Sequence, residues 1–403
     1  MAKPERTFWP TRHVVSLSWR ATLGSALAVA LVVENLAGQA AVTEWRVSQQ
    51  PVFSVGGDQG PAEEFFTRIV DAFRLEDGRL VVADGPEFRI SVYNADGRRV
   101  STFGNDGEGP GEFRSIAAIW SAGGDSIGVY DSRLQRITRF RADGSVIRTD
   151  KIEFVDMDAA SARGNLDLFL GSFRDGRIAI AWLAATPYAA NRLLPDHMTI
   201  GVFDSHARLL RTLGRYRGME RVYIPEVGSG PIAFSPYPWA AVVHDTLAYT
   251  NGADGSIVLL DPDADSARAR QLAVPGPDRS LREAWADLDD ALEAAETPSP
   301  MIRLSQRADR SMGSVPRFAR MFADDAGRIW LKDFDPGTDA LAVRRSRYVT
   351  GGTWRIVDTS GRQVARITMP ENVAPLAVDG NMLIAIARDE LDVESLVVLP
   401  IVR

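Results

Sequence analysis

The sequence predicts an all-β fold, a six-bladed β-propeller of four-stranded blades with one short helical insertion. A segment recurs 48 positions later; the matching pairs are Gly56 and Gly104, Asp58 and Asp106, Glu64 and Glu112, and Phe65 and Phe113. Between the two copies, short alternating apolar runs are separated by Asp-Gly turns. A period of about 40–50 residues with several strands per unit is typical of propeller blades. The 403-residue chain is 45% apolar, which is enough for one large closed ring.

The first blade has the clearest strand pattern. Its strands are expected at residues 68–75, 79–83, 88–93 and 99–103, with Ile90 and Val92 on one face of the third strand. Turns are expected at 77–78 and 96–97, both Asp-Gly, because Gly tolerates a positive φ and Asp hydrogen-bonds the turn. Two hairpins with alternating faces therefore make one blade.

The later blades show the same pattern of strands and turns, with less regular spacing. Strands are expected at 116–120, 126–130, 136–140 and 145–148; at 166–173, 177–183, 198–203 and 208–213; at 240–243, 246–250, 256–260 and 270–274; and at 318–322, 328–332, 354–358 and 363–368. The sixth blade has only three, at 376–378, 382–387 and 394–400. We expect residues 45–55 to supply its missing outer strand, because pairing the two chain ends closes the ring and removes an open edge.

Two insertions interrupt the strand pattern. Ser280 and Glu283 form a capping box, and the apolar residues that follow share one helical face: Leu281, Trp285, Leu288, Leu292 and Ala295. This predicts a short helix within residues 275–300, ended by Pro298 and Pro300. The second insertion, residues 214–239, is rich in Tyr, Phe, Pro and Arg and is expected to be a long loop.

The N-terminal residues 1–40 are predicted to be a signal peptide, followed by one propeller domain over 41–403. Arg6, Arg12 and Arg20 precede an apolar stretch of 13 residues, 21–33, which is too short to span a bilayer as a helix. Small residues near position 40 suit cleavage before Ala41. A periplasmic or extracellular protein without a later membrane span is expected; the alternative is a leader retained as an anchor.

Composition excludes several classes of chemistry. The chain has no Cys, so it has no disulfide, thiolate nucleophile, Cys-based zinc site or iron–sulfur cluster. The net charge of −7 gives no electrostatic reason to expect nucleic acid as a partner. We expect a monomer.

The loop at residues 103–113, FGNDGEGPGEF, resembles the inter-blade loop of NHL-type repeats and of bacterial six-bladed β-propeller proteins. Asp84 with Arg89-Ile90, and Asp131 with Arg136-Ile137, resemble the strand pattern of those repeats. The resemblance covers residues 45–150 well and weakens afterwards. It implies a ring that serves as a platform: members bind proteins or carbohydrates, act as sensor domains, or, in related propellers, are lactonases or lyases with a metal in the channel. The repeated Asp and Arg are expected to stabilise turns, because repeated residues usually serve the repeat.

Few residues suggest catalysis or metal binding. His197, His206 and His244 each lie near an Asp but share no metal-ligand spacing, so they are expected in solvated turns. A calcium site at Asp106 and Glu108 is conceivable, although a blade-to-blade turn is the favoured interpretation. The expected innermost strands are mostly apolar, and no Ser/His/Asp triad is evident.

The candidate binding residues are Arg and aromatic side chains in the long loops: Arg217, Tyr223, Tyr237, Trp239, Arg344 and Tyr348. Such residues suit a binding surface, although solvated loops with a few buried anchors would have the same composition. The sequence therefore favours a binding or scaffold module for a protein, small-molecule or carbohydrate ligand, without a cofactor. The alternative is a metal-dependent hydrolase or lyase of the lactonase or amidoglycolate-lyase type, with a divalent ion such as Ca or Zn in the channel.

Overall fold

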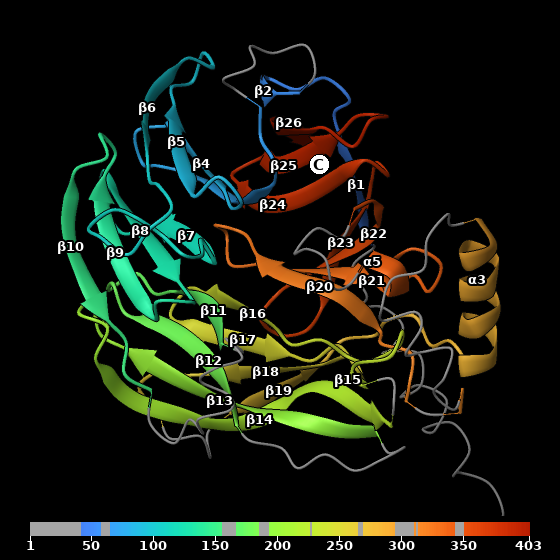
Figure 1. Cartoon of the computed structure of the whole chain (residues 1–403). Helices are drawn as coiled ribbons and strands as arrows, with labels where there is room; N and C mark the ends of the chain where they lie inside the picture. Colours follow the sequence, from blue (N-terminus) through green and yellow to red (C-terminus); the bar gives the residue numbers. More distant parts are fainter. Residues whose placement is uncertain are drawn as a thin grey trace, which may run out of the picture. The chain divides into compact units, whose positions relative to one another are not determined.

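The described chain consists mainly of β-strands arranged as a propeller. The computed structural model describes residues 42–57, 65–154, 167–184, 193–225, 228–264, 269–294, 310–311, 313–342 and 350–403. The predicted signal peptide lies outside these residues. Figure 1 shows the sheets following one another around the molecule in chain order. No helix within the described ranges is long and apolar enough to cross a membrane.

The strands form antiparallel groups in which sequence neighbours pair. The first group is β3 (Ile69–Arg74), β4 (Leu80–Asp84), β5 (Arg89–Tyr93) and β6 (Arg99–Phe103); the second is β7 (Ala118–Ser121), β8 (Ser126–Asp131), β9 (Arg136–Arg141) and β10 (Val146–Lys151). The third is β11 (Asp167–Ser172), β12 (Ile178–Ala184), β13 (Leu193–Phe203), β14 (Leu209–Ile224) and β15 (Gly228–Gly230). The fourth is β16 (Trp239–Val243), β17 (Thr246–Thr250), β18 (Ser256–Leu260) and β19 (Arg270–Ala273).

The remaining strands belong to one nine-stranded sheet. It contains β20 (Phe318–Ala323), β21 (Ile329–Asp333), β22 (Gly352–Val357) and β23 (Gln363–Met369), then β24 (Val373–Asp379), β25 (Met382–Arg388) and β26 (Glu394–Val402). The N-terminal strands β1 (Thr43–Val47) and β2 (Phe53–Gly56) complete it. β1 joins its two antiparallel halves, which are called the fifth group (β20 to β23) and the sixth group (β24 to β26 with β2) below. The hydrogen-bonded sheets therefore number five among the described residues.

The first strands of the groups contact one another in a closed cycle. β3 contacts β7, and the contacts continue through β11, β16, β20 and β24 back to β3. A buried hydrophobic cluster lies between each group and the next, from the one around Val92 and Ile127 to the one around Ile69 and Ile384. Burial of these faces against each other stabilises the cycle.

The chain ends pair as expected, but through two strands rather than one. The predicted strand 45–55 is divided at residues 48–52, which are not strand, although Ser48 N and Val52 N still donate to the β26 carbonyls of Pro400 and Val398. β2 is antiparallel to β26, with Phe53 opposite Val398, and forms the outer edge of the last group. β1 is parallel to β23 at Thr43 and antiparallel to β26 at Val47. The N-terminal segment therefore links two groups as well as closing the last one.

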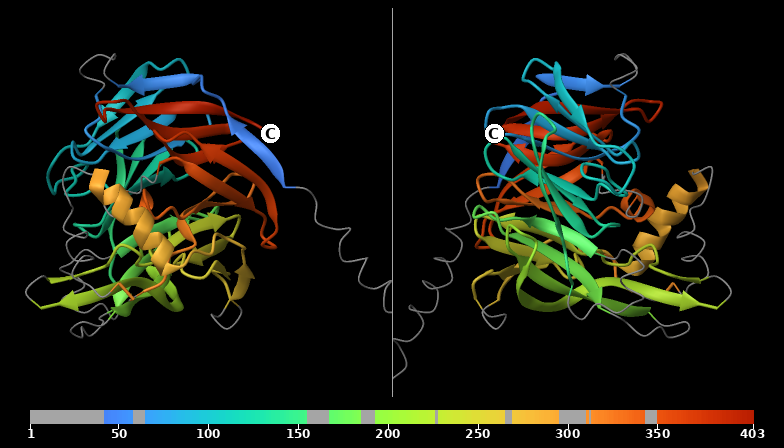
Figure 2. Two further views of the ribbon diagram at one scale, coloured as in Figure 1. Left: turned by 90° about the vertical axis from the view of Figure 1, so that its right-hand side faces the viewer. Right: turned by 60° about the vertical axis from the view of Figure 1, so that its left-hand side comes forward.

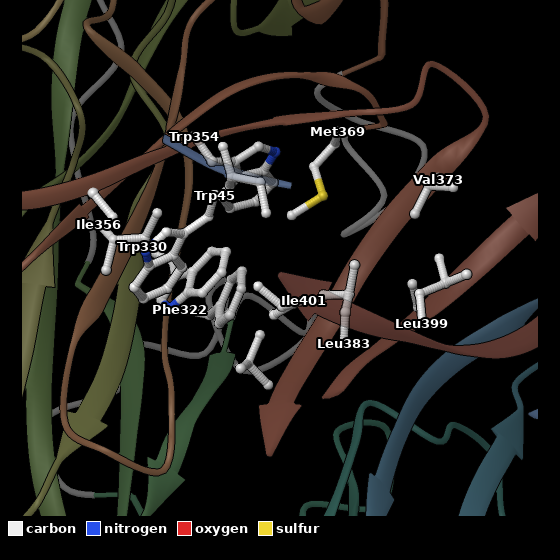
Figure 3. Close-up of a cluster of buried hydrophobic side chains, with 14 of the residues drawn as sticks. Trp45, Phe322, Trp330, Trp354, Ile356, Met369, Val373, Leu383, Leu399 and Ile401 are labelled. Carbon is white, nitrogen blue, oxygen red and sulfur yellow. The ribbon is translucent and has the colours of Figure 1, made fainter. Parts of the chain in front are cut away.

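Trp45 anchors β1 in the core. Its ring centroid lies 5.8 Å from that of Trp330, and Figure 3 shows it among the buried side chains of the last two groups. The guanidinium carbons of Arg328 and Arg403 lie 4.9 and 4.8 Å from the Trp45 ring centroid. The indole thus combines apolar burial with two cation–π contacts.

The third group corrects one prediction from sequence. Residues 214–224, expected as a loop, continue β14, which pairs with a longer β13 and then with β15. The segment LGRYRGMERVYI alternates along the strand, and its burial alternates with it: Val222 is buried and Tyr223 is exposed. Its aromatic and Arg content suggested a loop, but its period of two is typical of a strand.

The helical insertion forms as expected. α3 spans Leu281–Ala294, and Ser280 Oγ accepts from the Glu283 N–H at 3.3 Å while Glu283 Oε2 accepts from Ser280 at both N (3.1 Å) and Oγ (2.7 Å). Trp285 and Leu288 pack on Phe234, Phe334 and the short helix α5 (Asp339–Ala342). Figure 2 shows α3 lying outside the sheets.

The structure corrects the predicted 48-residue repeat at its aromatic residue, where Phe66 and not Phe65 is equivalent to Phe113. Gly56 and Gly104 both have a positive φ, 84° and 99°, and a side chain at Gly56 would collide with the Phe66 ring. Phe113 packs against Gly104 in the same way. Phe66 is therefore the equivalent of Phe113, whereas Phe65, predicted for that role, is 38% exposed. The first loop is one residue longer than the second, so the spacing changes from 48 to 47 (66 to 113).

Candidate ligand site in the central channel

A cavity of about 270 Å³ lies where the first strands meet. Each strand of the closed cycle contributes at least one lining residue. Examples are Asp71 (β3), Ala118 (β7), Phe169 (β11), Ala241 (β16), Met321 (β20) and Leu376 (β24). Because all the groups contribute, the cavity lies on the axis of the ring. Its volume corresponds to roughly nine water molecules.

Two charged side chains face this mostly apolar cavity. Asp71 lies on β3, where its carboxylate accepts from Ala72 N at 3.0 Å and Ile119 N at 3.3 Å. Arg320 lies on β20, is 6% exposed, and places its guanidinium carbon 5.9 Å from the Phe322 ring centroid. The two backbone N–H groups orient the Asp71 carboxylate beside the cavity.

An aromatic pair forms one wall of the cavity. Tyr237 precedes β16 and Trp239 begins it; their ring centroids are 5.0 Å apart with planes at 49°. The Trp239 Nε1–H is buried and has no hydrogen-bond partner among the described residues. A buried donor without an acceptor is costly, so this group would be stabilised by a ligand acceptor.

The structure brings together only part of the predicted site. Tyr237 and Trp239 line the channel cavity. Arg217 and Tyr223 lie on β14 and do not line it; Arg217 pairs with Glu220 at 2.9 Å, and Tyr223 is 39% exposed. Arg344 and Tyr348 lie outside the described residues.

Sequence reasoning missed the two charged residues of the cavity. Asp71 and Arg320 were hidden because the innermost strands were treated as apolar. The signal was present: each is a single charged residue within an apolar run, IVDAF and FARMF. A charge in the centre of an innermost strand must face either the channel or a buried partner.

The histidines occupy two kinds of position. His206 and His244 are exposed in turns, as predicted, but His197 lies within β13 and is half-buried. That correction follows from the same lengthening of the third group, because β13 begins five residues before the expected strand. His197 pairs across the strands with Arg217 and Ala184.

The candidate metal ligands have other partners. Arg114 forms ion pairs with Asp106 at 2.9 Å and Glu108 at 3.6 Å. Within the part of the chain that the structure describes, no group of three or more His, Asp or Glu side chains is placed to hold a metal ion.

A buried acid–phenol pair lies beside the channel-lining Leu168. Tyr130 OH donates to Asp167 Oδ2, and both side chains are buried. Burial raises the pKa of the Asp167 carboxyl, opposed by the Tyr130 hydrogen bond and reinforced by the Asp131 charge. Burial likewise raises the pKa of Tyr130 well above its ordinary value.

Comparison with known proteins supports the fold. A family model described as a 6-bladed beta-propeller matches residues 62–172. A solved structure of a DUF4221 family member from Bacteroides vulgatus is similar over 90% of this chain and 100% of its own, at 9% identity and a TM-score of 0.53. The chain is a β-propeller protein.

Further similar structures have lower scores. The match to an exported protein from Bacteroides fragilis covers 89% of this chain and 96% of the other, at 11% identity and a TM-score of 0.49. The match to a virginiamycin B lyase from Staphylococcus aureus covers 87% of this chain and 88% of the lyase, at 12% identity and a TM-score of 0.40. Comparison with curated proteins gives no match.

Proposed function

We propose that this protein is an exported six-bladed propeller with NHL-like repeats that binds a small ligand in its channel without transforming it. The six-blade assignment is supported by the closed cycle of first strands and by the matching family description. It treats the two halves of the nine-stranded sheet as separate blades that β1 bridges. β2 then supplies the fourth strand of the last blade.

Export is supported by the charged and apolar pattern of residues 1–40. If the leader is cleaved, protein recovered from the periplasm or the medium should begin at or near Ala41. N-terminal sequencing, or the intact mass of the exported protein, measures this directly. A mature protein that retains residues 21–33 would support the anchor instead.

The channel cavity is the observation that carries the binding proposal. It combines one negative and one positive side chain with an aromatic wall and a buried indole N–H that has no partner among the described residues. Such a cavity suits a small polar molecule with an apolar face, of the size of a monosaccharide or an amino acid. The ligand would place an acceptor on Trp239 and its polar groups between Asp71 and Arg320.

Ligand capture from a metabolite extract tests this proposal. The purified protein is incubated with the extract and washed, and the retained small molecules are identified by mass spectrometry. Trp239→Phe keeps the ring but loses the N–H, so binding should weaken by about 1 kcal/mol. Arg320→Met should abolish retention.

Tyr223→Phe is the matched control, because Tyr223 is an exposed aromatic residue on β14, outside the cavity. It should retain the same molecules as the wild type. An identical retention profile for the wild type and for Arg320→Met would contradict the channel site. Loss of an activity together with a stoichiometric metal ion would favour the hydrolase or lyase alternative.

A further inference from the structure

A second cavity, of about 450 Å³, is lined by the ends of β7 and β11 and the turns after them, next to the channel-lining parts of the same strands. The channel is lined by Ala118 of β7 and residues 168–171 of β11, whereas this cavity is lined by residues 120–123 and 172–176. Trp120 of the second cavity stacks on Phe169 of the channel, with ring centroids 4.4 Å apart. The cavity therefore lies between the second and third groups, at the turns that end their first strands.

Arg139 is the unusual residue in this cavity. It lies on β9 and is half-buried, and its guanidinium makes no hydrogen bond or ion pair with the described residues; its Nε is fully buried. Burial lowers the pKa of Arg139, and the nearby Arg148 charge adds to this effect. The charges of Asp150 and Asp204 oppose this effect, but neither acid forms an ion pair with Arg139, and Asp150 pairs with Arg148 at 2.7 Å. A half-buried guanidinium that forms no ion pair with the described residues would be stabilised by an anion from outside the chain.

Other donors converge on the same space. Arg174 is exposed and also has no ion pair with the described residues. The hydroxyl groups of Ser121 and Ser172, which end β7 and β11, line the cavity and have no hydrogen-bond partner in the described ranges.

The acids that line this cavity already have partners. Asp175 forms an ion pair with Arg177 at 2.6 Å, and Glu76 accepts from Gly124 N at 3.4 Å. The side chains without partners are thus donors: two guanidinium groups and two hydroxyls.

We propose that this cavity binds an oxyanion, a carboxylate, phosphate or sulfate group of a small molecule, through Arg139 and Arg174. A planar guanidinium forms paired, charge-assisted hydrogen bonds with such groups, and serine hydroxyls complete the coordination. The proposal does not depend on the channel ligand, because the two cavities share no lining residue.

Calorimetric titration and thermal melts with inorganic phosphate, sulfate and acetate test the oxyanion site, with chloride keeping the ionic strength constant. At least one anion should give a saturable signal at one site per chain. Phosphate or sulfate binding would indicate a tetrahedral ester, and acetate binding a carboxylate. Arg139→Gln and Arg174→Gln should each weaken binding at least about tenfold.

Arg141→Gln is the matched control, because Arg141 is exposed on the same strand and does not line the cavity. It should bind the anion as the wild type does. Arg174 is exposed, so its variant tests the site even if Arg139→Gln fails to fold. An absence of saturable binding, or equal binding by Arg174→Gln and Arg141→Gln, would overturn the proposal. Trp239→Phe should leave anion binding unchanged, which separates this test from that of the channel.

Discussion

The Tyr130–Asp167 pair shows how one residue can make stability depend on pH. Asp167 begins β11 and is 6% exposed, and its Oδ1 has no hydrogen-bond partner among the described residues. Tyr130 is fully buried and donates to the other carboxylate oxygen. The ionised carboxylate is therefore poorly solvated in the folded protein, and the folded state favours its protonated form.

We predict that Asp167→Asn makes the protein less sensitive to rising pH. The pKa of Asp167 is raised on folding, so the unfolded chain loses this proton first, near pH 4, and stability falls as the pH rises through the folded pKa. Asn still accepts from Tyr130 but does not ionise. The difference in unfolding free energy, variant minus wild type, should increase from pH 4 to pH 7 in urea titrations.

Asp125→Asn is a suitable control, because this carboxylate is exposed in the turn between β7 and β8. Its pH profile should follow that of the wild type. If Asp167→Asn also follows the wild type at every pH, the buried carboxylate does not contribute to the pH dependence.

Of the residues that line the channel cavity, the sequence singled out the aromatic pair but not the charged pair. Tyr237 and Trp239 were identified because Arg and aromatic side chains gathered in long loops suit a binding surface. Asp71 and Arg320 were not, because local sequence does not distinguish a charge that faces a channel from one that faces a buried partner. The convergence of the innermost strands decides that, and it depends on closure of the entire ring.

Among the elements, predictions succeeded where short-range chemistry determines the structure. Asp-Gly turns delimit the hairpins, so most predicted strands lie within two or three residues of those observed. The prediction for the third group failed because the chain does not turn at Gly214: the pairing with β13 only shifts register there, and β14 continues to Ile224. Its partner β13 stabilises that extension by pairing as far as Leu193, a long-range effect that no local pattern shows.

The capping box should determine the stability of the start of α3. Ser280→Ala removes both side-chain hydrogen bonds with Glu283 and should cost about 1 kcal/mol locally. Hydrogen exchange of the first-turn amides, Glu283 included, should accelerate roughly five- to tenfold. Ser280→Asp keeps a capping acceptor and should preserve protection of the Glu283 amide. Equal exchange rates in Ser280→Ala and the wild type would contradict a role for this cap.

Trp45 should contribute most of the stability that β1 provides. Trp45→Ala removes a buried indole with two cation–π contacts and should lower the unfolding free energy by about 3–5 kcal/mol. Val42→Ala, three residues earlier at a 42% exposed side chain, should change it by less than about 0.5 kcal/mol. Urea denaturation compares the two variants. Similar losses in both would mean that β1 is held by its backbone pairing alone.

At the scale of the whole molecule, stability depends on joining the chain ends. Each group buries one face against the group before it and the other against the group after it, so the last group needs the first. The N-terminal segment completes this cycle, with Trp45 in the cluster of the last two groups and Phe53 in the cluster between the last and the first.

Removing residues 42–56 should therefore destabilise the entire ring rather than fray one end. The chain would lose the contribution of Trp45, about 3–5 kcal/mol, and burial of Phe53 and Val55 worth roughly 2 kcal/mol each, and the open edge of β26 would lose its partners. A loss of about 7–9 kcal/mol is comparable with the total stability of many domains, so the truncated chain should melt many degrees lower. A synthetic peptide of residues 42–56 should restore the melting temperature by pairing with β23 and β26, whereas the same peptide with Trp45→Ala should not. An unchanged melting curve after truncation would refute closure of the ring by this segment.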